Sequence, residues 1–389
     1  MHMKKPVHIV FTTIYHPAVL DSLFENIARF NNLDVVKVWV VGDKKTPDSC
    51  GEMAARVSRQ GLETVYLDIK MQEQWGRKCE SFYNRLPYNN ETRRNIGYLH
   101  AWENNCEIMI SIDDDNYPLE DDLVGFHRNT GSTWKQGRLH EKTGFHNICE
   151  YLEFIPDRQI FPRGFPFRLR GTANQPVILD DGKSVVIGAL GGLWLNDPDV
   201  DATTWLNGSI KGTGYNGLDI QVLDHSTWTP LNTQNTSIVR ELIPAYLCIP
   251  MAWKVPGGSI QRYGDIWGGY FLQALIKETP YHIAFGRPLM DHRRNQHDYV
   301  DDLRFEYWGM ILTDWLLQKL RKDFQPVASS ITDRVDELAN FIKSIIPELP
   351  DWCAHEIREF LLWTSGNLKT WAEACRTLDS KSEESSLSI

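Results

Sequence analysis

The sequence predicts an α/β fold with a mostly parallel central sheet, followed by a helical region near the C-terminal end. Residues Val7–Thr13 and Val35–Val41 are apolar, largely β-branched runs that are typical of buried strands. Between them, Leu20–Phe30 carries its apolar residues at helical spacing. A strand, a helix and a strand in this order form a β–α–β unit, which places the two strands parallel. Beyond Tyr299 the apolar spacing is helical throughout.

The length of the chain allows one large domain with an appendage, or two modest domains. At 389 residues it exceeds the usual size of a single hydrophobic core. The expected helices of the appendage are Phe305–Leu320, Asp333–Ile345 and Ala354–Leu378. We therefore expect a main domain over residues 1–300, a helical region over residues 301–379, and a disordered Ser- and Glu-rich tail over residues 380–389.

The composition is that of a soluble globular protein, with 42% hydrophobic and 24% charged residues. A formal net charge of -10 argues against nucleic acid or an anionic membrane as a partner. No stretch reaches membrane-spanning length, and the N-terminus lacks the long apolar run of a signal peptide. The seven scattered cysteines include no CxxC pair, which fits a reduced compartment. We expect a cytoplasmic protein, and a homo-oligomer is compatible with the sequence.

A third strand, Glu63–Asp68, and a mostly helical segment, Asn90–Glu107, lead to the buried strand Ile108–Ile112. This last strand ends directly in three adjacent aspartates, Asp113–Asp115. In an open α/β sheet the carboxyl ends of the strands form the ligand crevice. The three carboxylates are therefore expected at the mouth of a binding site.

Adjacent carboxylates repel one another unless a cation lies among them, and Mg²⁺ or Mn²⁺ prefers carboxylate oxygens. Asp113, Asp114 and Asp115 could thus bridge a divalent metal to a diphosphate. A solvated acidic turn that merely ends the strand explains the same three residues equally well.

Two polar residues near this edge have a functional and a structural interpretation. Asp43, at the end of the second strand, could accept hydrogen bonds from a base or ribose, or it could cap a loop. Arg94 presents a fork of donors that suits phosphate oxygens, although an exposed helix face explains it as well.

From Phe145 onward the composition changes. The segment Phe161–Arg170 holds three arginines, and its two prolines and glycine exclude a helix, so we expect a stiff loop that presents Arg163 and Arg170 to phosphate or sugar. In Gly188–Pro198, Trp194 offers an aromatic face for a base or sugar ring, although a core position explains it at least as well.

A second dense block, Gln261–Tyr270, places Arg262 and Asp265 just before a predicted helix. Asp265 could face a ligand, or it could only complement the positive end of that helix. His292 follows a strand-like run. A lone histidine is usually structural, but this one could join the acidic residues as a third metal ligand.

Four of these segments occur in the same order, and at similar spacing, in a known protein family. They are Ile112–Asp115, Pro162–Arg170, Gly192–Ala202 and Arg262–Gly269. Through them the chain resembles the plant reversibly glycosylated polypeptides, which are UDP-arabinopyranose mutases, and their bacterial relatives. The match extends over most of residues 7–310.

The resemblance implies a GT-A type nucleotide-diphospho-sugar fold with a metal and diphosphate site at the acidic turn. In that family two arginines matter for catalysis, and they correspond to Arg163, which is linked to transient glycosylation, and Arg170. We therefore predict three groups of residues. The metal ligands are Asp113, Asp115 and His292; the nucleotide-sugar contacts are Asp43, Arg94, Asp114, Trp194 and Arg262; the catalytic residues are Arg163, Arg170 and Asp265.

Some positions depart from the family pattern. Arg168 replaces a serine, Gly264 replaces an aspartate, and the segment Gln175–Thr229 looks longer and rearranged. These changes fall where the sugar would lie, so they affect the preference for sugar and nucleotide.

The activity that the resemblance implies is a Mn²⁺- or Mg²⁺-dependent mutase, which interconverts the pyranose and furanose forms of a UDP-arabinose-like sugar or a GDP-sugar. No G-x-G-x-x-G motif follows a strand and opens a helix, so we expect no flavin. A glycosyltransferase with an external acceptor is the alternative, because the fold alone does not distinguish the two. A self-glycosylated nucleotide-sugar-binding protein is a second alternative.

Overall fold

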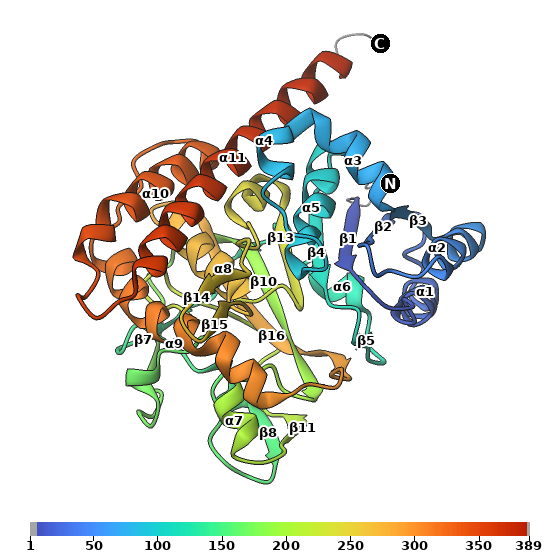
Figure 1. Ribbon diagram of the computed structural model, residues 1–389. Helices are drawn as coiled ribbons and strands as arrows, with labels where there is room; N and C mark the ends of the chain where they lie inside the picture. The colour runs from blue at the N-terminus through green and yellow to red at the C-terminus, as the bar shows by residue number, and fades with distance from the viewer. Residues whose placement is uncertain (1–5, 387–389) are drawn as a thin grey trace.

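A mixed sheet of twelve strands runs through the computed structural model, which describes residues 6–386 (Figure 1). The main path of this sheet is, in spatial order, β12 (Ile220–Val222), β16 (Tyr281–His292), β10 (Val185–Asn196), β13 (Asn235–Val239), β4 (Ile108–Ile112), β1 (Val7–Thr12), β2 (Val36–Val41) and β3 (Glu63–Leu67). Strands β4, β1, β2 and β3 are parallel, as predicted, whereas β13 is antiparallel to both of its neighbours.

Short strands extend this sheet or form two separate ribbons. The extensions are β5 (Asn116–Pro118), β6 (Thr133–Trp134), β8 (Leu152–Ile155) and β11 (Lys211–Tyr215), and the ribbons pair β7 (Arg138–Glu141) with β9 (Pro176–Leu179) and β14 (Trp253–Val255) with β15 (Gly258–Ile260). The α/β class is confirmed. The parallel half with its acidic turn after β4 agrees with the GT-A type fold that the family resemblance implies.

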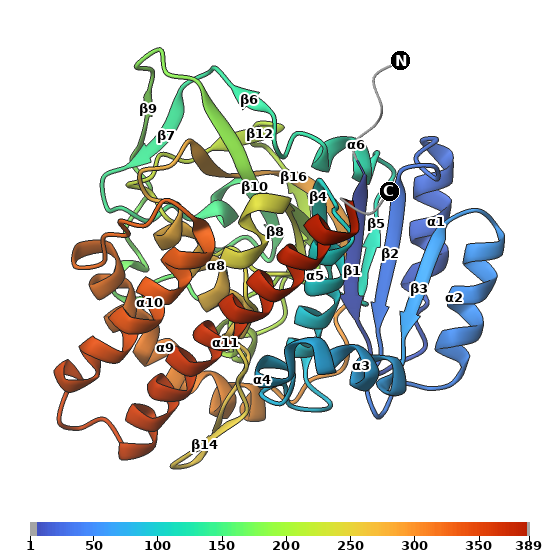
Figure 2. The same cartoon turned by 90° about the horizontal axis from the view of Figure 1, so that it is seen from above.

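Helices cover both faces of the parallel half, with α1 and α2 on one face and α5 on the other (Figure 2). The α-helices are α1 (Val19–Arg29), α2 (Ser49–Arg59), α3 (Ile69–Gly76), α4 (Glu80–Tyr83), α5 (Arg94–Glu103), α6 (Leu123–His127), α7 (Ala202–Leu206), α8 (Gly264–Leu275), α9 (Tyr299–Lys322), α10 (Ile331–Ile345) and α11 (His355–Ser386). Short 3-10 helices are η1 (Arg77–Cys79), η2 (Glu91–Arg93), η3 (Ile148–Tyr151), η4 (Phe167–Leu169), η5 (Arg240–Ala245) and η6 (Ile346–Glu348).

Strand periodicity explains why the central runs are apolar throughout. Successive side chains of a strand point to opposite faces. In β1, Ile9 and Phe11 pack against α1 and α2, whereas Val10 belongs to the core on the other face. In β4, Ile110 lies on the same face as Ile9 and Phe11, and Met109 lies on the same face as Val10. Strands that are buried on both faces need a continuous apolar run, which is the pattern seen in the sequence.

The C-terminal helices gather on the side of the molecule opposite α1 and α2 (Figure 1). They share one apolar core with α5 and α8. Two indole groups anchor α11 to the main domain. Trp371 of α11 donates to the carbonyl of Pro244 at 2.7 Å, and Trp102 of α5 donates to the carbonyl of Cys375 in α11 at 3.0 Å. Among the described residues, no helix is both long and apolar enough to cross a membrane.

Two predicted elements differ from the structure. The tail expected to be disordered from residue 380 instead continues α11 to Ser386, because extending an existing helix adds a hydrogen bond without a new nucleus; residues 387–389 lie outside the described range. Helix α8 begins earlier than expected, at Gly264. The glycine-rich block after Gly188 lies in β10, where shifts in register occur beside Gly188 and Gly192.

Helix α8 packs closely against the backbone that precedes it. A Cβ atom on Gly264 or Gly268 would lie 2.3 Å from a backbone carbonyl oxygen, and one on Gly269 would lie 1.8 Å from the carbonyl oxygen of Leu231. Only glycine permits this approach, which fixes the N-terminal end of α8 and the Asp265 side chain beside the sheet.

We expect Gly269→Ala to lower the free energy of unfolding by about 1–3 kcal/mol, because a rigid backbone oxygen must move. Gly366→Ala in α11 is the matched control. There a Cβ would meet only the flexible Arg85 guanidinium, at 2.9 Å, and alanine favours a helix by up to about 1 kcal/mol. Urea denaturation of both variants measures the difference. Equal stability of the two variants would contradict this close packing.

Candidate active site

Two adjoining cavities, of about 260 and 220 Å³, lie where β1 and β4 end. The first is lined by residues 12–15 after β1, by the segment 89–91, and by the acidic turn. The second is lined by polar and charged side chains: Glu91, Arg94, Asp113, Asp115, Arg163, Asp199, Thr233, Gln234, Arg262, Asp265, His292, Arg294 and His297. The two cavities share Glu91, Arg94, Asp113 and Asp115, so they form one cleft with a common wall.

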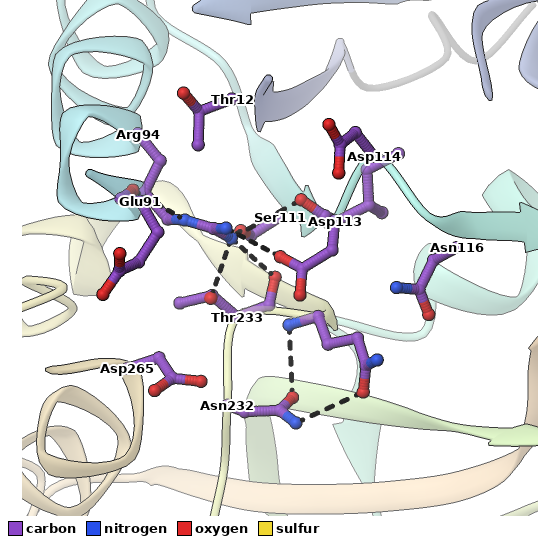
Figure 3. A network of polar contacts seen from close by, with 12 residues as sticks. Thr12, Glu91, Arg94, Ser111, Asp113, Asp114, Asn116, Asn232, Thr233 and Asp265 are labelled. Atoms are coloured by element: carbon purple, nitrogen blue, oxygen red, sulfur yellow. Dashed lines mark hydrogen bonds and ion pairs between the residues drawn. The ribbon is translucent and has the colours of Figure 1, made fainter. Parts of the chain in front are cut away.

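Arg94, the first residue of α5, holds this wall together (Figure 3). Its Nη2 atom contacts Asp113 Oδ1 at 2.7 Å, and its Nη1 atom donates to the hydroxyl of Thr233 at 2.8 Å. Further donations reach the Ser111 hydroxyl at 3.3 Å and the Glu91 carbonyl at 3.2 Å. A buried guanidinium with this many partners has little donor capacity left for a ligand. Arg94 therefore mainly orients the acidic turn.

The three aspartates of the turn point to different partners. Asp113 pairs with Arg94, and Asp114 accepts a hydrogen bond from the Thr13 hydroxyl beside the first cavity. Burial raises the pKa of Asp114 to about 6, and the charges of Asp115 and Asp113 add to this effect. Asp115 lies 3.5 Å from His292. Burial raises the pKa of Asp115, but the contact with His292 and hydrogen bonds from backbone N–H groups together lower it. The repulsion within the turn favours a bound cation.

His292, at the end of β16, has the geometry of a metal-binding histidine. Its Nδ1 atom lies 2.6 Å from the Asp197 carbonyl oxygen, which leaves Nε2 facing Asp115. A ligating histidine commonly donates its other ring N–H to such a carbonyl. Within residues 6–386, however, no three acidic, histidine or cysteine side chains are preassembled as a metal site. Asp113 is held by Arg94, so Asp115 and His292 are the pair that fits a cation.

Arg163 lies between two carboxylates in the second cavity. Its Nε and Nη2 atoms contact Asp199 at 2.9 and 3.2 Å, and its Nη1 and Nη2 atoms contact Asp265 at 3.1 and 2.9 Å. The Nη1 atom also donates to the carbonyl of Arg262. These contacts engage all five N–H donors of the guanidinium. Arg163 thus fixes both carboxylates and presents no unused donor.

Arg262 also lines the second cavity, and it is likewise paired. Its Nε atom contacts Glu306 of α9 at 2.8 Å, and its Nη1 atom lies 3.5 Å from Asp302. Asp302 also contacts Arg294 at 3.3 Å. The N-terminal part of α9 therefore anchors the basic side of the cavity.

Three predicted residues do not line either cavity. Asp43 is buried and accepts hydrogen bonds from the backbone N–H groups of Lys44 at 2.7 Å and Asn90 at 3.2 Å, so it caps a loop. Trp194 is a core residue with 4% exposure. Arg170 pairs with Asp201 and stacks over Phe167 at 3.7 Å.

Sequence reasoning missed several residues that the fold brings to the cleft: Glu91, Asp199, Thr233, Gln234, Arg294 and His297. Asp199 was visible as part of the Gly192–Ala202 block, but its role depends on a contact with Arg163, 36 positions away. Glu91 was part of a predicted helix, and nothing in its local pattern indicated that its carboxyl group faces a cavity.

The chain belongs to the reversibly glycosylated polypeptide family, since the model of that family matches residues 59–365. It is 24% identical over 221 residues to UDP-arabinopyranose mutase 3 of Arabidopsis thaliana, covering 57% of this chain and 55% of that protein. UDP-arabinopyranose mutase 2 of the same plant is 25% identical over 55% of this chain and 54% of its own length. The chain thus spans about half the length of these curated relatives.

A longer match is to a probable UDP-arabinopyranose mutase 1 of Pisum sativum, at 24% identity over 77% of this chain and 75% of that protein. Among solved structures, glucosyl-3-phosphoglycerate synthase of Mycobacterium tuberculosis with Mn²⁺ and UDP-glucose aligns with a TM-score of 0.39 and 13% identity, covering 80% of this chain and 79% of that one. A mannosyltransferase of Pyrobaculum calidifontis with GDP-mannose and Mn²⁺ aligns with a TM-score of 0.38 and 12% identity over 100% and 76% of the chains.

The raised pKa of Asp114 predicts how the stability of the protein depends on pH. The pKa of Asp114, about 6, is higher than the value of about 3.9 in an unfolded chain. The folded state therefore disfavours the charged form, and the penalty grows as the pH rises from about 4 to 6 and remains above that range. In chelator and without nucleotide, Asp114→Asn should raise the free energy of unfolding at pH 7.5 by on the order of 2 kcal/mol. The difference should shrink toward pH 4.

Asp113→Asn is the contrasting variant. It leaves the buried Arg94 without its charged partner, so it should lower the free energy of unfolding at pH 7.5 by about 1–3 kcal/mol. Urea denaturation at several pH values measures both variants. A loss of stability in both at pH 7.5 would show that Asp114 is not strained by its neighbours.

Proposed function

We propose that the protein is a metal-dependent nucleotide-diphospho-sugar mutase that converts a sugar between its pyranose and furanose forms. The observation that carries this proposal is the cleft itself. Two cavities meet at the acidic turn, and the second is lined by fixed carboxylates and paired arginines. Such a cleft suits a nucleotide on one side, a sugar on the other and a diphosphate between them. Membership of the reversibly glycosylated polypeptide family supports the same conclusion.

The first cavity fits the nucleotide. Tyr15, which is 52% exposed, offers an aromatic face for a base, and Asn90 and the segment after β1 provide polar edges. The diphosphate then lies against the acidic turn, where its negative charge requires a cation. Asp115 and His292 would hold this cation, which as a Lewis acid would stabilise the diphosphate when the bond to the sugar breaks.

The second cavity fits the sugar. Asp265 and Asp199 are held rigidly by Arg163, and their oxygen atoms can accept hydrogen bonds from sugar hydroxyl groups. A fixed acceptor of this kind costs little reorganisation when the sugar rearranges. Because every N–H of Arg163 is engaged, we assign the guanidinium to positioning these carboxylates. A covalent bond from Arg163 to the sugar would require breaking part of this network.

The reaction itself tests the proposal. Incubation of UDP-arabinopyranose, and of a panel of other UDP- and GDP-sugars, with the protein and Mn²⁺ should give the furanose form without acceptor and without net hydrolysis. NMR of the nucleotide sugar measures the two ring forms. Arg163→Lys should lower kcat by on the order of 10²-fold with a smaller effect on nucleotide binding, because lysine cannot hold both carboxylates in place. Transfer to an added acceptor without ring contraction would instead identify a glycosyltransferase.

Removal of the metal is a separate prediction. Asp115→Asn and His292→Ala should each weaken Mn²⁺-dependent UDP binding by more than about 10–100-fold, the loss that follows even from removing an outer-shell partner. Chelator should reproduce this loss in the unmutated protein. His297→Ala is the matched control, because His297 lines the same cavity but pairs with Asp302. Calorimetry measures binding, and full UDP affinity in excess chelator would exclude the metal site.

A further inference from the structure

Glu91 occupies a rigid position in the wall between the two cavities. It begins the short 3-10 helix η2, which is capped by the side chain of Asn90 through the Thr92 N–H at 3.0 Å. The backbone of Asn90 is in turn held by Asp43 at 3.2 Å. The Glu91 carbonyl accepts from Arg94. The backbone around Glu91 is therefore fixed on both sides.

The carboxyl group of Glu91 differs from every other acid of the cleft wall. Asp113 is paired with Arg94, and Asp115 contacts His292. Apart from its own backbone amide, Glu91 has no hydrogen-bond or ion-pair partner among the described residues, and Figure 3 shows its side chain directed toward the same space as Asp265. An acid left without a partner in a polar cavity is available to a ligand.

The surroundings of Glu91 favour its neutral form. The charged or titratable groups that face it are Asp265, Arg262, Arg94, Asp113, Asp115 and the Cys248 thiol. Burial raises the pKa of Glu91, and the charge of Asp265 raises it further, against the opposing charges of Arg94 and Arg262. A carboxylate in such a place is a stronger base than one in water, and its conjugate acid persists closer to neutral pH.

We propose that Glu91 is a catalytic residue of the ring interconversion, which takes a proton from one sugar hydroxyl group and returns it to another. This inference rests on the proposed mutase function. It names a residue that borders both cavities, a position from which one group can serve the atoms on either side of C1 in both halves of the reaction.

The two halves of the reaction balance in atoms and electrons with Glu91 as the one proton carrier. In the first half, the hydroxyl oxygen that will close the smaller ring attacks C1 while the bond from C1 to the diphosphate oxygen breaks. The electron pair of that bond leaves with the diphosphate, and the hydroxyl proton passes to the Glu91 carboxylate. In the second half, a diphosphate oxygen attacks C1 and the bond from C1 to the original ring oxygen breaks. That oxygen keeps the electron pair and takes the proton from Glu91.

Asp265 is less suited to this task. Both of its oxygen atoms accept from the Arg163 guanidinium, so protonation would cost two charge-assisted hydrogen bonds. Asp199 is restrained by the same guanidinium and by Asn232 at 2.6 Å. These two residues can position the sugar, whereas Glu91 can exchange a proton without losing a partner.

The test compares Glu91→Gln with Glu91→Asp in the full-length protein with Mn²⁺ and the nucleotide sugar that it interconverts. Glu91→Gln should lower kcat by about 10²–10⁴-fold, the usual contribution of general acid–base catalysis, while KM and UDP affinity change far less. The fall in kcat/KM of the unmutated protein at low pH, where Glu91 becomes protonated, should be absent in this variant. Glu91→Asp keeps a carboxyl group, so it should retain that fall and part of the activity. Glu120→Gln, an exposed glutamate that lines neither cavity, should behave as the unmutated protein.

A second measurement separates chemistry from folding. Glu91→Ala should regain turnover when formate is added, whereas Arg163→Lys should not, because only the first lacks a proton carrier. If the unmutated protein contracts the ring but Glu91→Gln keeps its kcat and its pH profile, the role of Glu91 is overturned and the mutase function stands. Failure of formate to restore a folded, UDP-binding Glu91→Ala protein would also count against it. If the unmutated protein contracts no sugar ring, the proposed function falls, and this inference falls with it.

Discussion

The arrangement of the cleft depends on a single buried guanidinium, that of Arg163. Its contacts join three distant parts of the chain, since Asp199 follows β10, Asp265 lies in the first turn of α8, and Arg163 itself lies in the proline-rich loop. Removing these charges from water is costly, and the cost is offset only when every donor and acceptor is satisfied. The five engaged N–H groups meet that condition. The loop, the sheet and α8 must therefore assemble together before the second cavity exists.

Arg94 is a second buried guanidinium whose donors are used within the protein. It lies in the wall that the two cavities share, where it joins α5 to the acidic turn and to the segment before β13. Arg94 was expected to contact phosphate or to lie on an exposed helix face, and Arg163 to contact phosphate or sugar; in the structure both use their donors internally. The distinction matters for function, because a guanidinium already bound to carboxylates supplies geometry rather than charge to a ligand. In the proposed function, the charge that balances the diphosphate must then come from elsewhere in the cleft.

The sequence predicted the fold class and the position of the acidic turn because these depend on local patterns. The alternation of β-branched runs and amphipathic segments identified β1, α1 and β2 nearly to the residue, and β4 runs directly into the acidic turn. Local patterns could not place Glu91 or Asp199 in the cleft, because these residues come to line it only when segments distant in the sequence pack together. Trp194 was grouped with the site for its aromatic face, with a core position as the alternative, and Arg170 was grouped with it through the family resemblance. Packing places Trp194 in the core and pairs Arg170 with Asp201.

In the function that we propose, the balance of charge links the metal to the proton carrier. The second cavity is lined by five carboxylates, Glu91, Asp113, Asp115, Asp199 and Asp265, and by four arginines that are already paired with acids. A diphosphate adds further negative charge to this wall, and without a cation it would be repelled or would force a carboxyl group to take up a proton. Glu91, whose carboxyl group has no partner among the described residues other than its own backbone N–H, is the group that would respond. A cation at Asp115 and His292 would relieve that repulsion and return Glu91 to its basic form. In this proposal, binding of the metal and readiness of Glu91 to accept a proton would thus be two consequences of the same local field.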